Sequence, residues 1–372
     1  MRTREYTLAL NNLITPLSKT FSGKKVLITG NTGFKGSWLT IWLEHLGAMV
    51  TGFSNTEKTQ PSMFEDLRLA KHVNQFYGDI ADRDALLESI KTIKPDFIFH
   101  LAAQSIVSKS YSGPLETIKT NSLGTATLLD VLVDLEFAGV AVMITSDKCY
   151  ENDERSTGYR EDDRLGGRDP YSASKAAAEI FLSTYIRSFF HDSSRQRIGI
   201  ARAGNVIGGG DWNENRIVVD CAKAWLNNQK VFIRNPEATR PWQHVLEPLS
   251  GYLRLAQKLS ETAALNGEAF NFGPKESNVY TVNEIVNRLG KCWGYEEVEN
   301  HLEFSQNSVM HEVSLLSLNC EKASKELSWS PRLEIDECLK LVADWYIQFG
   351  RNSDELFELT IEQIKFYESK VG

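Results

Sequence analysis

The chain has 372 residues, of which 42% are hydrophobic, 24% charged and 10% aromatic. This composition excludes a disordered or fibrous protein, and the length excludes a small fold held together by disulfides. The formal net charge of −8 argues against a broad nucleic-acid-binding surface, so we expect a small-molecule partner and no nucleic acid.

Residues 1–20 are predicted to form an N-terminal extension that packs on the surface or mediates assembly. Their apolar stretch is broken at Asn11 and Asn12 and no cleavage-like end follows, which argues against a signal peptide. Nowhere do about 18 apolar residues run together, so we expect no membrane contact. The five cysteines are scattered without a CxxC pair, which favours reduced thiols in the cytoplasm and no metal site.

From Lys24 onward, short β-rich segments alternate with amphipathic segments of helix length. This alternation is typical of βαβ units and predicts an α/β fold, a Rossmann-type doubly wound parallel sheet with helices on both faces. The expected strands are KKVLIT, AMVTGF, VNQFYGD, DFIFHLA, VAVMIT and RIGIARA. The expected helices between them cover residues 34–46, 83–93, 115–137 and 172–190.

A glycine motif links the first expected strand to the helix that follows it. Gly30 permits a tight turn, Gly33 lets a pyrophosphate approach the backbone, and Gly36 lets the helix pack closely on the strand. Because the motif opens a βαβ unit, we favour binding of a dinucleotide cofactor over an ordinary glycine turn. The predicted cofactor-binding set also includes the intervening residues Asn31, Phe34 and Lys35.

The second expected strand lacks an acidic residue at its end. An Asp or Glu about twenty positions after the glycines normally binds the ribose 2′-hydroxyl of NAD, whereas Ser54, Asn55 and Thr56 occupy this region. This position therefore does not exclude NADP. Asp79, after the third strand, is a candidate for the adenine amine, and capping of a loop is equally compatible. His100 is expected to be a hydrogen-bonded residue at a strand end.

Two segments carry residues suited to catalysis. Tyr171 and Lys175, in YSASK, lie one helical turn apart, so both side chains can face the same side of a helix. A nearby ammonium and a positively charged nicotinamide favour the phenolate, so Tyr171 is the predicted base. Ser146, Asp147 and Lys148 follow the strand VAVMIT, at the sheet edge where this fold places its ligands. An adjacent acid and base are useful only if the substrate also exchanges a proton and a leaving group.

After about residue 204 the sequence changes to glycine-rich loops, isolated short strands and longer helices. We therefore assign residues 21–203 to an NAD-binding Rossmann domain and residues 204–372 mainly to a smaller α/β C-terminal lobe that binds the substrate. The segment FNFG is apolar enough to return to a sheet edge. Residues near 241–273 are accordingly expected to rejoin the first domain.

These motifs resemble the extended short-chain dehydrogenase/reductase family, and specifically its sugar-nucleotide 4,6-dehydratases. The resemblance covers nearly the whole chain from about Phe21 and rests on NTGFKGSWL, LAAQS, TSDKCYEN, YSASK, ARAGNVIGGGDW and RPWQHV in this order. In the related dTDP-glucose enzymes a glutamate follows the catalytic aspartate, whereas Lys148 here is similar to the CDP-glucose branch. The resemblance therefore implies NAD as cofactor, CDP-glucose as substrate, and a role in deoxysugar synthesis for bacterial O-antigen.

The resemblance also implies an internal redox cycle. Tyr171, oriented by Lys175 and Ser146, would deprotonate the hydroxyl on carbon 4 of the glucosyl ring while hydride passes to NAD. Lys148 would then take the proton on carbon 5, and Asp147 would protonate the departing hydroxyl on carbon 6. Return of the hydride to carbon 6 would give a 4-keto-6-deoxy sugar without net consumption of the cofactor.

Further site residues follow from the same resemblance. The cofactor-binding set is extended by Asp79, Ile80, Leu101, Ala102, Ala103 and Asn121. The substrate-binding set is Gln104, Ser105, Asn205, Arg216 and Arg240. The two arginines suit phosphate oxygens because a guanidinium can bind two at once, and an ordinary surface role is the alternative, more strongly for Arg216. For Asn121 a structural role within a helix is equally compatible.

Two other functions remain open on the sequence. A nucleotide-sugar 4-epimerase would use the same cofactor without eliminating water, but it would not need Asp147 and Lys148. A non-catalytic NAD-binding protein on the same scaffold is opposed by the intact set of Ser146, Tyr171 and Lys175. The resemblance further implies a homodimer built from the two long helices that follow the fourth and fifth strands, or a homotetramer.

Overall fold

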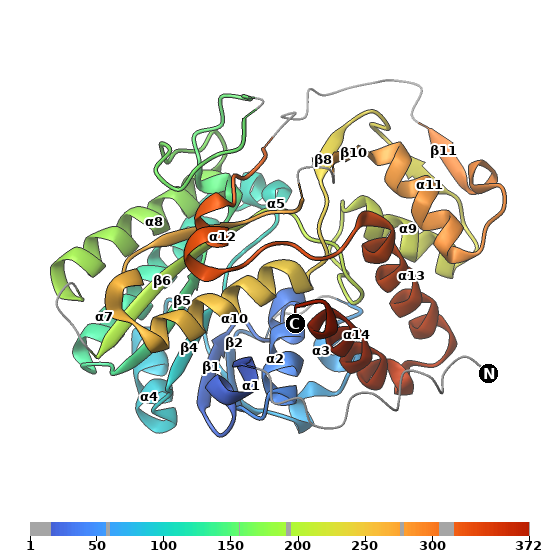
Figure 1. Ribbon diagram of the computed structural model, residues 1–372. Helices are drawn as coiled ribbons and strands as arrows, with labels where there is room; N and C mark the ends of the chain where they lie inside the picture. The colour runs from blue at the N-terminus through green and yellow to red at the C-terminus, as the bar shows by residue number, and fades with distance from the viewer. Residues whose placement is uncertain are drawn as a thin grey trace.

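A seven-stranded parallel sheet forms the centre of the computed structural model, which describes residues 16–56, 60–155, 157–190, 195–275, 279–304 and 316–371 (Figure 1). In spatial order the strands are β3 (Asn74–Tyr77), β2 (Met49–Ser54), β1 (Lys25–Thr29), β4 (Phe97–His100), β5 (Gly139–Ile144), β6 (Gln196–Ala203) and β9 (Ala269–Phe272). Each neighbouring pair is parallel. The predicted doubly wound sheet is confirmed.

Both faces of the sheet are covered because its strands are apolar on both sides. Along β1, Val26 and Ile28 belong to one hydrophobic cluster and Leu27 belongs to the other. The first cluster includes buried residues of α2 (Phe34–His45) and α10 (Leu246–Glu261). The second includes buried residues of α4 (Arg83–Ile93), α7 (Gly124–Asp134) and α8 (Pro170–Phe189).

The helix expected over residues 115–137 is interrupted. It consists of α6 (Pro114–Ile118), a π-helical turn η2 (Lys119–Leu123) and α7, and it is preceded by the short helix α5 (Val107–Ser112). The wider turn brings Asn121 to the backbone of Gln104, from which its Oδ1 accepts a hydrogen bond at 2.8 Å. The apolar pattern predicted a continuous helix because this tertiary contact leaves no trace in the periodicity.

The later chain forms a second group of helices and short strands (Figure 1). It contains α9 (Ile217–Leu226), α11 (Val282–Trp293) and α13 (Ile335–Arg351). Strand β7 (Val231–Ile233) pairs with β11 (Leu302–Phe304), and β8 (Thr239–Pro241) pairs with β10 (Val279–Thr281). Strand β9, which contains FNF, lies beside β6 in the main sheet. We retain the limits 21–203 and 204–372 as a proposal.

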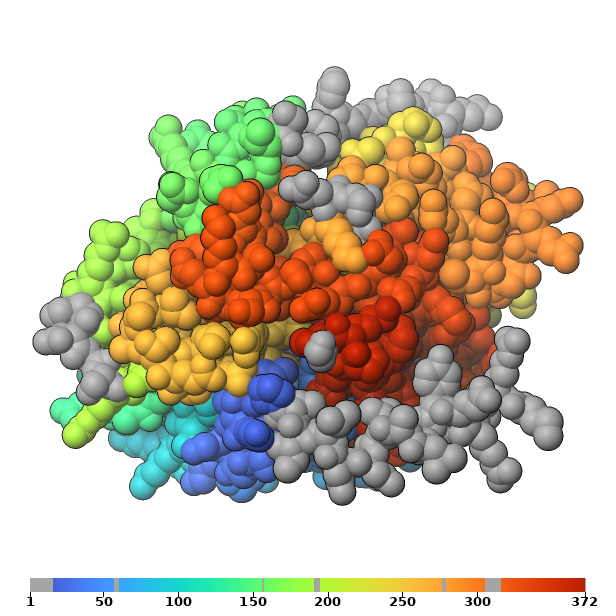
Figure 2. Space-filling model, in the orientation of Figure 1, coloured from blue at the N-terminus to red at the C-terminus, as the bar shows by residue number. Residues whose placement is uncertain are grey.

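The two ends of the described chain pack on the sheet domain. Helix α1 (Pro16–Phe21) buries Phe21, whose ring lies 4.9 Å from that of Phe97. Helix α14 (Leu356–Val371) lies against α2, where Trp42 Nε1 donates to Glu368 Oε1 at 2.8 Å. In Figure 2 the red C-terminal segment and the orange-red segment that contains α12 (Glu321–Leu327) both form part of the surface of this face. Residues 1–15, most of the predicted extension, lie outside the described residues.

Candidate active site

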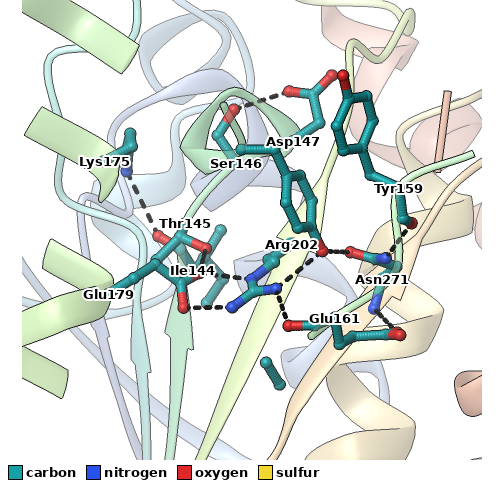
Figure 3. Close-up of polar contacts among 12 residues, drawn as sticks. Ile144, Thr145, Ser146, Asp147, Tyr159, Glu161, Lys175, Glu179, Arg202 and Asn271 are labelled. Carbon is teal, nitrogen blue, oxygen red and sulfur yellow. Dashed lines mark hydrogen bonds and ion pairs between the residues drawn. The ribbon is translucent and has the colours of Figure 1, made fainter. Parts of the chain in front are cut away.

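The carboxyl end of β5 leads into a short turn that carries the predicted acid and base. Ser146 caps the 3-10 turn η3 (Asp147–Cys149), its Oγ accepting from the Lys148 backbone N–H at 3.2 Å. Ser146 Oγ also donates to Asp147 Oδ1 at 2.9 Å (Figure 3). Ser146 and Asp147 are buried, and Lys148 is partly exposed.

Helix α8 brings the other two predicted residues to the same place. Its N-terminus is fixed by Asp169, whose carboxylate accepts from the Ser172 backbone N–H at 3.0 Å. Tyr171 follows in the first turn and is hydrogen-bonded to Ser146. Lys175, one turn later, donates from Nζ to the carbonyl of Ile144 at 3.4 Å (Figure 3). The structure thus places Tyr171 and Lys175 beside the turn of Ser146 and Asp147.

Burial is the main influence on the pKa values of Asp147, Tyr171 and Lys175. It raises the pKa of Asp147 above its ordinary value, while the nearby Lys148 ammonium acts in the opposite direction. It lowers the pKa of Lys175 to about 8. Burial also raises the pKa of Tyr171 to about 12, against a smaller lowering by the hydrogen bond with Ser146. The expected lowering of the Tyr171 pKa is therefore not found in the chain alone, because removal of the phenolate from water outweighs the polar contacts.

The glycine loop has the shape of a phosphate-binding cradle. Gly30 has φ +76°, and a Cβ there would lie 2.7 Å from the Ala102 backbone N. A Cβ on Gly36 would lie 2.2 Å from the Gly30 carbonyl oxygen, so α2 packs directly on the turn. A Cβ on Gly33 would meet only the Gly30 oxygen, at 3.4 Å, so the loop surface at Gly33 is open. A turn at the start of a helix that is tightly packed at Gly30 and Gly36 and open at Gly33 fits the pyrophosphate of a dinucleotide.

Lys35, in this loop, lies close enough to Asp147 and Lys175 for their charges to act on it. Burial lowers the pKa of Lys35 to about 8, and the positive charge of Arg216 lowers it further, while Asp147 raises it. Lys35 is therefore electrostatically coupled to the predicted acid and to a predicted substrate residue. Phe34 lies beside it and contacts the loop at Gly208, where a Cβ would come within 2.9 Å of the Phe34 ring.

Amide side chains occupy the place where an acidic residue was expected. Asn31 Nδ2 donates to Gln75 Oε1 at 2.7 Å, and Gln75 Nε2 donates to Ser54 Oγ at 3.2 Å. Gln75, which the sequence analysis missed, comes from β3 and reaches the end of β2. Asp79 forms an ion pair with Lys119, with 2.7 Å between Oδ2 and Nζ, and accepts from the Ala81 N–H at 3.0 Å. Its pKa is lowered chiefly by Lys119.

The remaining predicted cofactor residues line the ends of β3 and β4. The Leu101 N–H donates to the Thr29 carbonyl at 3.0 Å, and Ala102 and Ala103 follow directly. Ile80 is buried against Gly124, where a Cβ would lie 2.5 Å from the Ile80 side chain.

His100 and Asn121 have their polar atoms engaged within the protein. His100 is hydrogen-bonded through Nδ1 to Thr29 at 2.8 Å and through Nε2 to Thr125 at 3.0 Å, which confirms the expected structural role. Asn121 Nδ2 donates to the Gln104 carbonyl at 3.0 Å and to Ser174 Oγ at 2.9 Å. These bonds favour the structural alternative for Asn121.

The predicted substrate residues are less closely gathered. Gln104 Nε2 donates to Thr117 Oγ1 at 3.0 Å, while Ser105 and Asn205 are exposed. Arg216 donates to Asp211, and Arg240 donates to the Thr239 carbonyl at 2.9 Å. Of these residues, Arg216 is the one whose charge acts on both Tyr171 and Lys35.

The glycine-rich loop that carries Asn205 also serves the core. A Cβ on Gly209 would lie 2.0 Å from the Trp345 ring, and one on Gly210 would lie 2.7 Å from the Met63 side chain. Gly204 lies against the turn that carries Asp147, since a Cβ on Gly204 would lie 3.1 Å from Asp147 Oδ2.

A second set of buried polar residues lies next to the turn that carries Ser146 and Asp147. Glu179 on α8 and Arg202 on β6 form an ion pair, with 2.8 Å between Arg202 Nε and Glu179 Oε1 (Figure 3). The sequence analysis missed this pair. Each residue is a single charge within an expected helix or strand, and the two positions meet only in the folded chain, so the sequence pattern gave little sign of the pair.

No group of three or more His, Cys, Asp or Glu side chains in the described ranges is arranged to hold a metal ion. No helix in these ranges combines the length and the apolar character that crossing a bilayer requires.

Comparisons with known proteins place this site in context. A family model described as GDP-mannose 4,6 dehydratase matches residues 27–342. The chain is 44% identical over 345 residues to CDP-glucose 4,6-dehydratase of Salmonella typhimurium, covering 90% of this chain and 94% of the relative. It is 25% identical over 339 residues to UDP-glucose 4-epimerase of Mycoplasma pneumoniae, covering 87% of this chain and 97% of the relative.

A solved structure shares the fold. DesIV, a dTDP-glucose 4,6-dehydratase from Streptomyces venezuelae with NAD and TYD bound, superposes with a TM-score of 0.74 at 23% identity. The match covers 87% of this chain and 97% of DesIV.

Proposed function

Because the chain belongs to the GDP-mannose 4,6 dehydratase family, we propose that it is an NAD-dependent hydro-lyase that converts CDP-glucose to CDP-4-keto-6-deoxyglucose and water. The observation that carries this proposal is the buried Asp147 carboxyl, next to Lys148 and hydrogen-bonded to Ser146, beside Tyr171 and Lys175. The choice of CDP-glucose is supported by the 44% identical relative and by Lys148.

The residues at the carboxyl ends of β1 and β4 fit NAD. The loop from Gly30 to Gly36 would hold the pyrophosphate, and Asn31, Ser54 and Gln75 would face the adenosine ribose with neutral amide and hydroxyl groups. When bound, NAD would hold the hydride taken from carbon 4 until it is returned to carbon 6.

Tyr171 and Lys175 act on the hydroxyl of carbon 4. The Tyr171 phenolate accepts its proton as the hydride leaves, and Ser146 holds the same oxygen through its hydroxyl. The hydrogen bond with Ser146 and the charge of Arg216 favour the phenolate against the effect of burial. The positive charge of a bound nicotinamide would act in the same direction.

Asp147 and Lys148 carry out the elimination. The ketone on carbon 4 acidifies the proton on carbon 5, which the neutral amine of Lys148 accepts and would return to carbon 5 as hydride adds to carbon 6. Asp147, kept protonated by burial, gives its proton to the hydroxyl leaving carbon 6, so one water is released. A 4-epimerase would need neither step, and this pair is therefore the reason to prefer a dehydratase over the epimerase or a non-catalytic protein.

A homodimer, or a homotetramer built from it, is part of the proposal. Large apolar side chains are exposed on both α6 and α8, which contact each other; among these side chains are Leu115 at 78%, Ile180 at 56% and Phe189 at 55%. Patches of this kind on a folded chain mark protein contacts. They lie on the helices that the resemblance assigns to the dimer.

We further propose that the protein acts in the cytoplasm on deoxysugars destined for surface polysaccharide such as O-antigen. All five cysteines lie among the described residues and none of them forms a disulfide there, which suits a reducing compartment. The biosynthetic setting follows from the resemblance.

The function is tested with the purified protein and separate CDP-glucose, dTDP-glucose and GDP-mannose samples, each with added NAD. Mass spectrometry is expected to show loss of one water from CDP-glucose and no net accumulation of NADH. An unchanged mass with inverted configuration at carbon 4 would establish an epimerase instead. Loss of water from another nucleotide sugar alone would retain the reaction and correct the base.

A further inference from the structure

A buried ion pair lies next to the active site and takes no part in the chemistry above. Arg202 Nε donates to Glu179 Oε1 at 2.8 Å, and Arg202 Nη2 donates to Glu179 Oε2 at 2.9 Å. The side-chain exposures are 5% for Arg202 and 2% for Glu179. Buried ion pairs seldom add net stability over apolar packing, because both charges lose their hydration. The contacts of this pair therefore indicate what it does.

Those contacts reach both ends of the turn that carries the acid and the base. Thr145, directly before Ser146, donates its hydroxyl to Glu179 Oε1 at 2.5 Å (Figure 3). Tyr150, directly after the turn η3, accepts from Arg202 Nη1 at 2.8 Å through its phenol oxygen. One ion pair thus binds the residue on each side of the segment from Ser146 to Cys149.

The same pair is anchored to the sheet and to the following loop. Arg202 Nη1 donates to the Glu161 carbonyl at 2.8 Å. The Tyr150 hydroxyl donates to Asn271 Oδ1 at 2.8 Å, and the Asn271 backbone N–H donates to Glu161 Oε1 at 2.8 Å. Arg202 and Asn271 are register partners on β6 and β9. Strands β6 and β9 therefore provide a rigid base for the turn.

Glu179 also belongs to the helix that carries the predicted base. Tyr171, Lys175 and Glu179 follow one another at intervals of one helical turn, so α8 presents them on one face. We propose that Arg202 and Glu179 are positioning residues that hold the turn of Asp147 and Lys148 at a fixed place relative to Tyr171 and Lys175. This inference rests on the proposed function, because it assigns separate steps to the helix and the turn.

If Arg202 and Glu179 position this turn, weakening their contacts should impair one step of the reaction more than the other. Oxidation at carbon 4 needs the α8 residues and Ser146, whereas elimination also needs Asp147 and Lys148 in register with the same sugar. A displacement of about 1 Å can cost a reaction about 100-fold. Weakening the network should therefore slow elimination more than oxidation, and reduced cofactor should accumulate on the enzyme during turnover.

Tyr150→Phe and Arg202→Lys test the network with small changes. Tyr150→Phe removes one oxygen, and Arg202→Lys keeps the charge while removing the bidentate fork. Tyr367→Phe is the matched control, since it removes a buried phenol hydroxyl that donates to Glu247 Oε2 at 2.6 Å, on α14 and α10. Each protein is assayed with CDP-glucose for kcat and KM, for the absorbance of bound reduced cofactor, and for its melting temperature.

We expect Tyr150→Phe to lower kcat about tenfold with KM changed less than about twofold, and Arg202→Lys to lower kcat further. Both variants should accumulate reduced cofactor. Tyr367→Phe should lower the melting temperature without affecting kcat or the cofactor signal. Unchanged kcat in Tyr150→Phe, or a loss of kcat without reduced cofactor, would overturn the proposal, and Tyr150→Phe decides alone if Arg202→Lys does not fold.

Amide hydrogen exchange supplies a readout that is independent of the substrate. Exchange at residues 146–150 should be faster in Tyr150→Phe than in the unaltered protein and unchanged in Tyr367→Phe. If the unaltered protein fails to dehydrate CDP-glucose, the proposed function fails, and the exchange data still decide the positioning role. Equal exchange in all three proteins would contradict it.

Discussion

Asp147 combines a structural cost with a proposed chemical use. Its carboxyl is buried, and burial raises its pKa, so the folded protein binds this proton more tightly than the unfolded chain does. As pH rises from the ordinary carboxyl range toward the raised folded value, ionisation in the unfolded chain draws the equilibrium away from the folded state. A side chain that costs stability at neutral pH is therefore retained where it can donate a proton.

Asp147→Asn should separate these two effects. The variant is expected to lower the rate of water loss by about 100-fold or more, because the amide cannot protonate the leaving hydroxyl. It should be more stable than the unaltered protein at neutral pH by on the order of 1 kcal/mol, with the difference vanishing below about pH 4. Denaturant unfolding across this pH range and the dehydration assay provide the two measurements.

Asp220→Asn serves as the control for this comparison. Asp220 lies on α9, and burial raises its pKa as well. This variant should shift stability in the same direction while leaving the rate of dehydration unchanged. Normal dehydration by Asp147→Asn would show that another group is the acid.

The sequence predicted the residues whose chemistry is tied to a local pattern. Tyr171 and Lys175 share one helix, and Ser146, Asp147 and Lys148 are contiguous, so spacing alone brings each set together. Gln75, Glu179 and Arg202 were missed because their partners lie on other elements of the chain. Arg202, for example, meets Tyr150 across 52 positions. Contacts of this kind depend on the register of the sheet, which the sequence pattern does not specify.

Among the elements, the strands were the most predictable. All six expected strands are present and parallel, because continuous apolar segments bounded by polar turns have few other ways to be buried. The helix over residues 115–137 was wrong in its continuity, since a π-helical turn at Lys119–Leu123 serves contacts of Asn121. The later chain has the expected short strands and longer helices, and the pairing of β7 with β11 and of β8 with β10 was not predicted.

Two glycine variants test the loop between β1 and α2, one for cofactor binding and one for packing. Gly33 has φ −76°, which alanine adopts without strain, and an added Cβ would meet only one backbone oxygen, at 3.4 Å. Gly33→Ala should therefore keep its melting temperature while weakening NAD binding about tenfold or more, because the methyl group would occupy the phosphate surface. Thermal unfolding and equilibrium titration with NAD measure the two quantities.

Gly36→Ala is the structural counterpart. Its Cβ would lie 2.2 Å from the Gly30 carbonyl oxygen, so helix and strand must separate. The variant should be destabilised by about 1–3 kcal/mol. Equal loss of NAD affinity in both variants, with equal loss of stability, would show that Gly33 serves packing and not the cofactor.

In the whole molecule, helices α1 and α14, at the two ends of the described chain, pack on the sheet domain. Helices α6 and α8, in contrast, expose large apolar side chains. Leu115→Glu should place a charge in the centre of the proposed dimer contact and convert the assembly to smaller species. Light scattering coupled to size-exclusion chromatography gives the mass.

Phe232→Glu provides the control, since Phe232 is also exposed, at 54%, but lies on β7 in the other part of the chain. Its mass should equal that of the unaltered protein. An unaltered protein that already runs as a monomer, or a Leu115→Glu variant of unchanged mass, would remove these helices from the interface.

In the proposed reaction, hydride moves within one sugar while water is lost. CDP-glucose carrying deuterium on carbon 4 tests it most directly, with NAD supplied and the product analysed by mass spectrometry and proton NMR. The expected product is a 4-keto-6-deoxy sugar that has lost one water and carries the deuterium on carbon 6. Deuterium found in released NADH or in solvent, or retained on carbon 4 without loss of water, would contradict it.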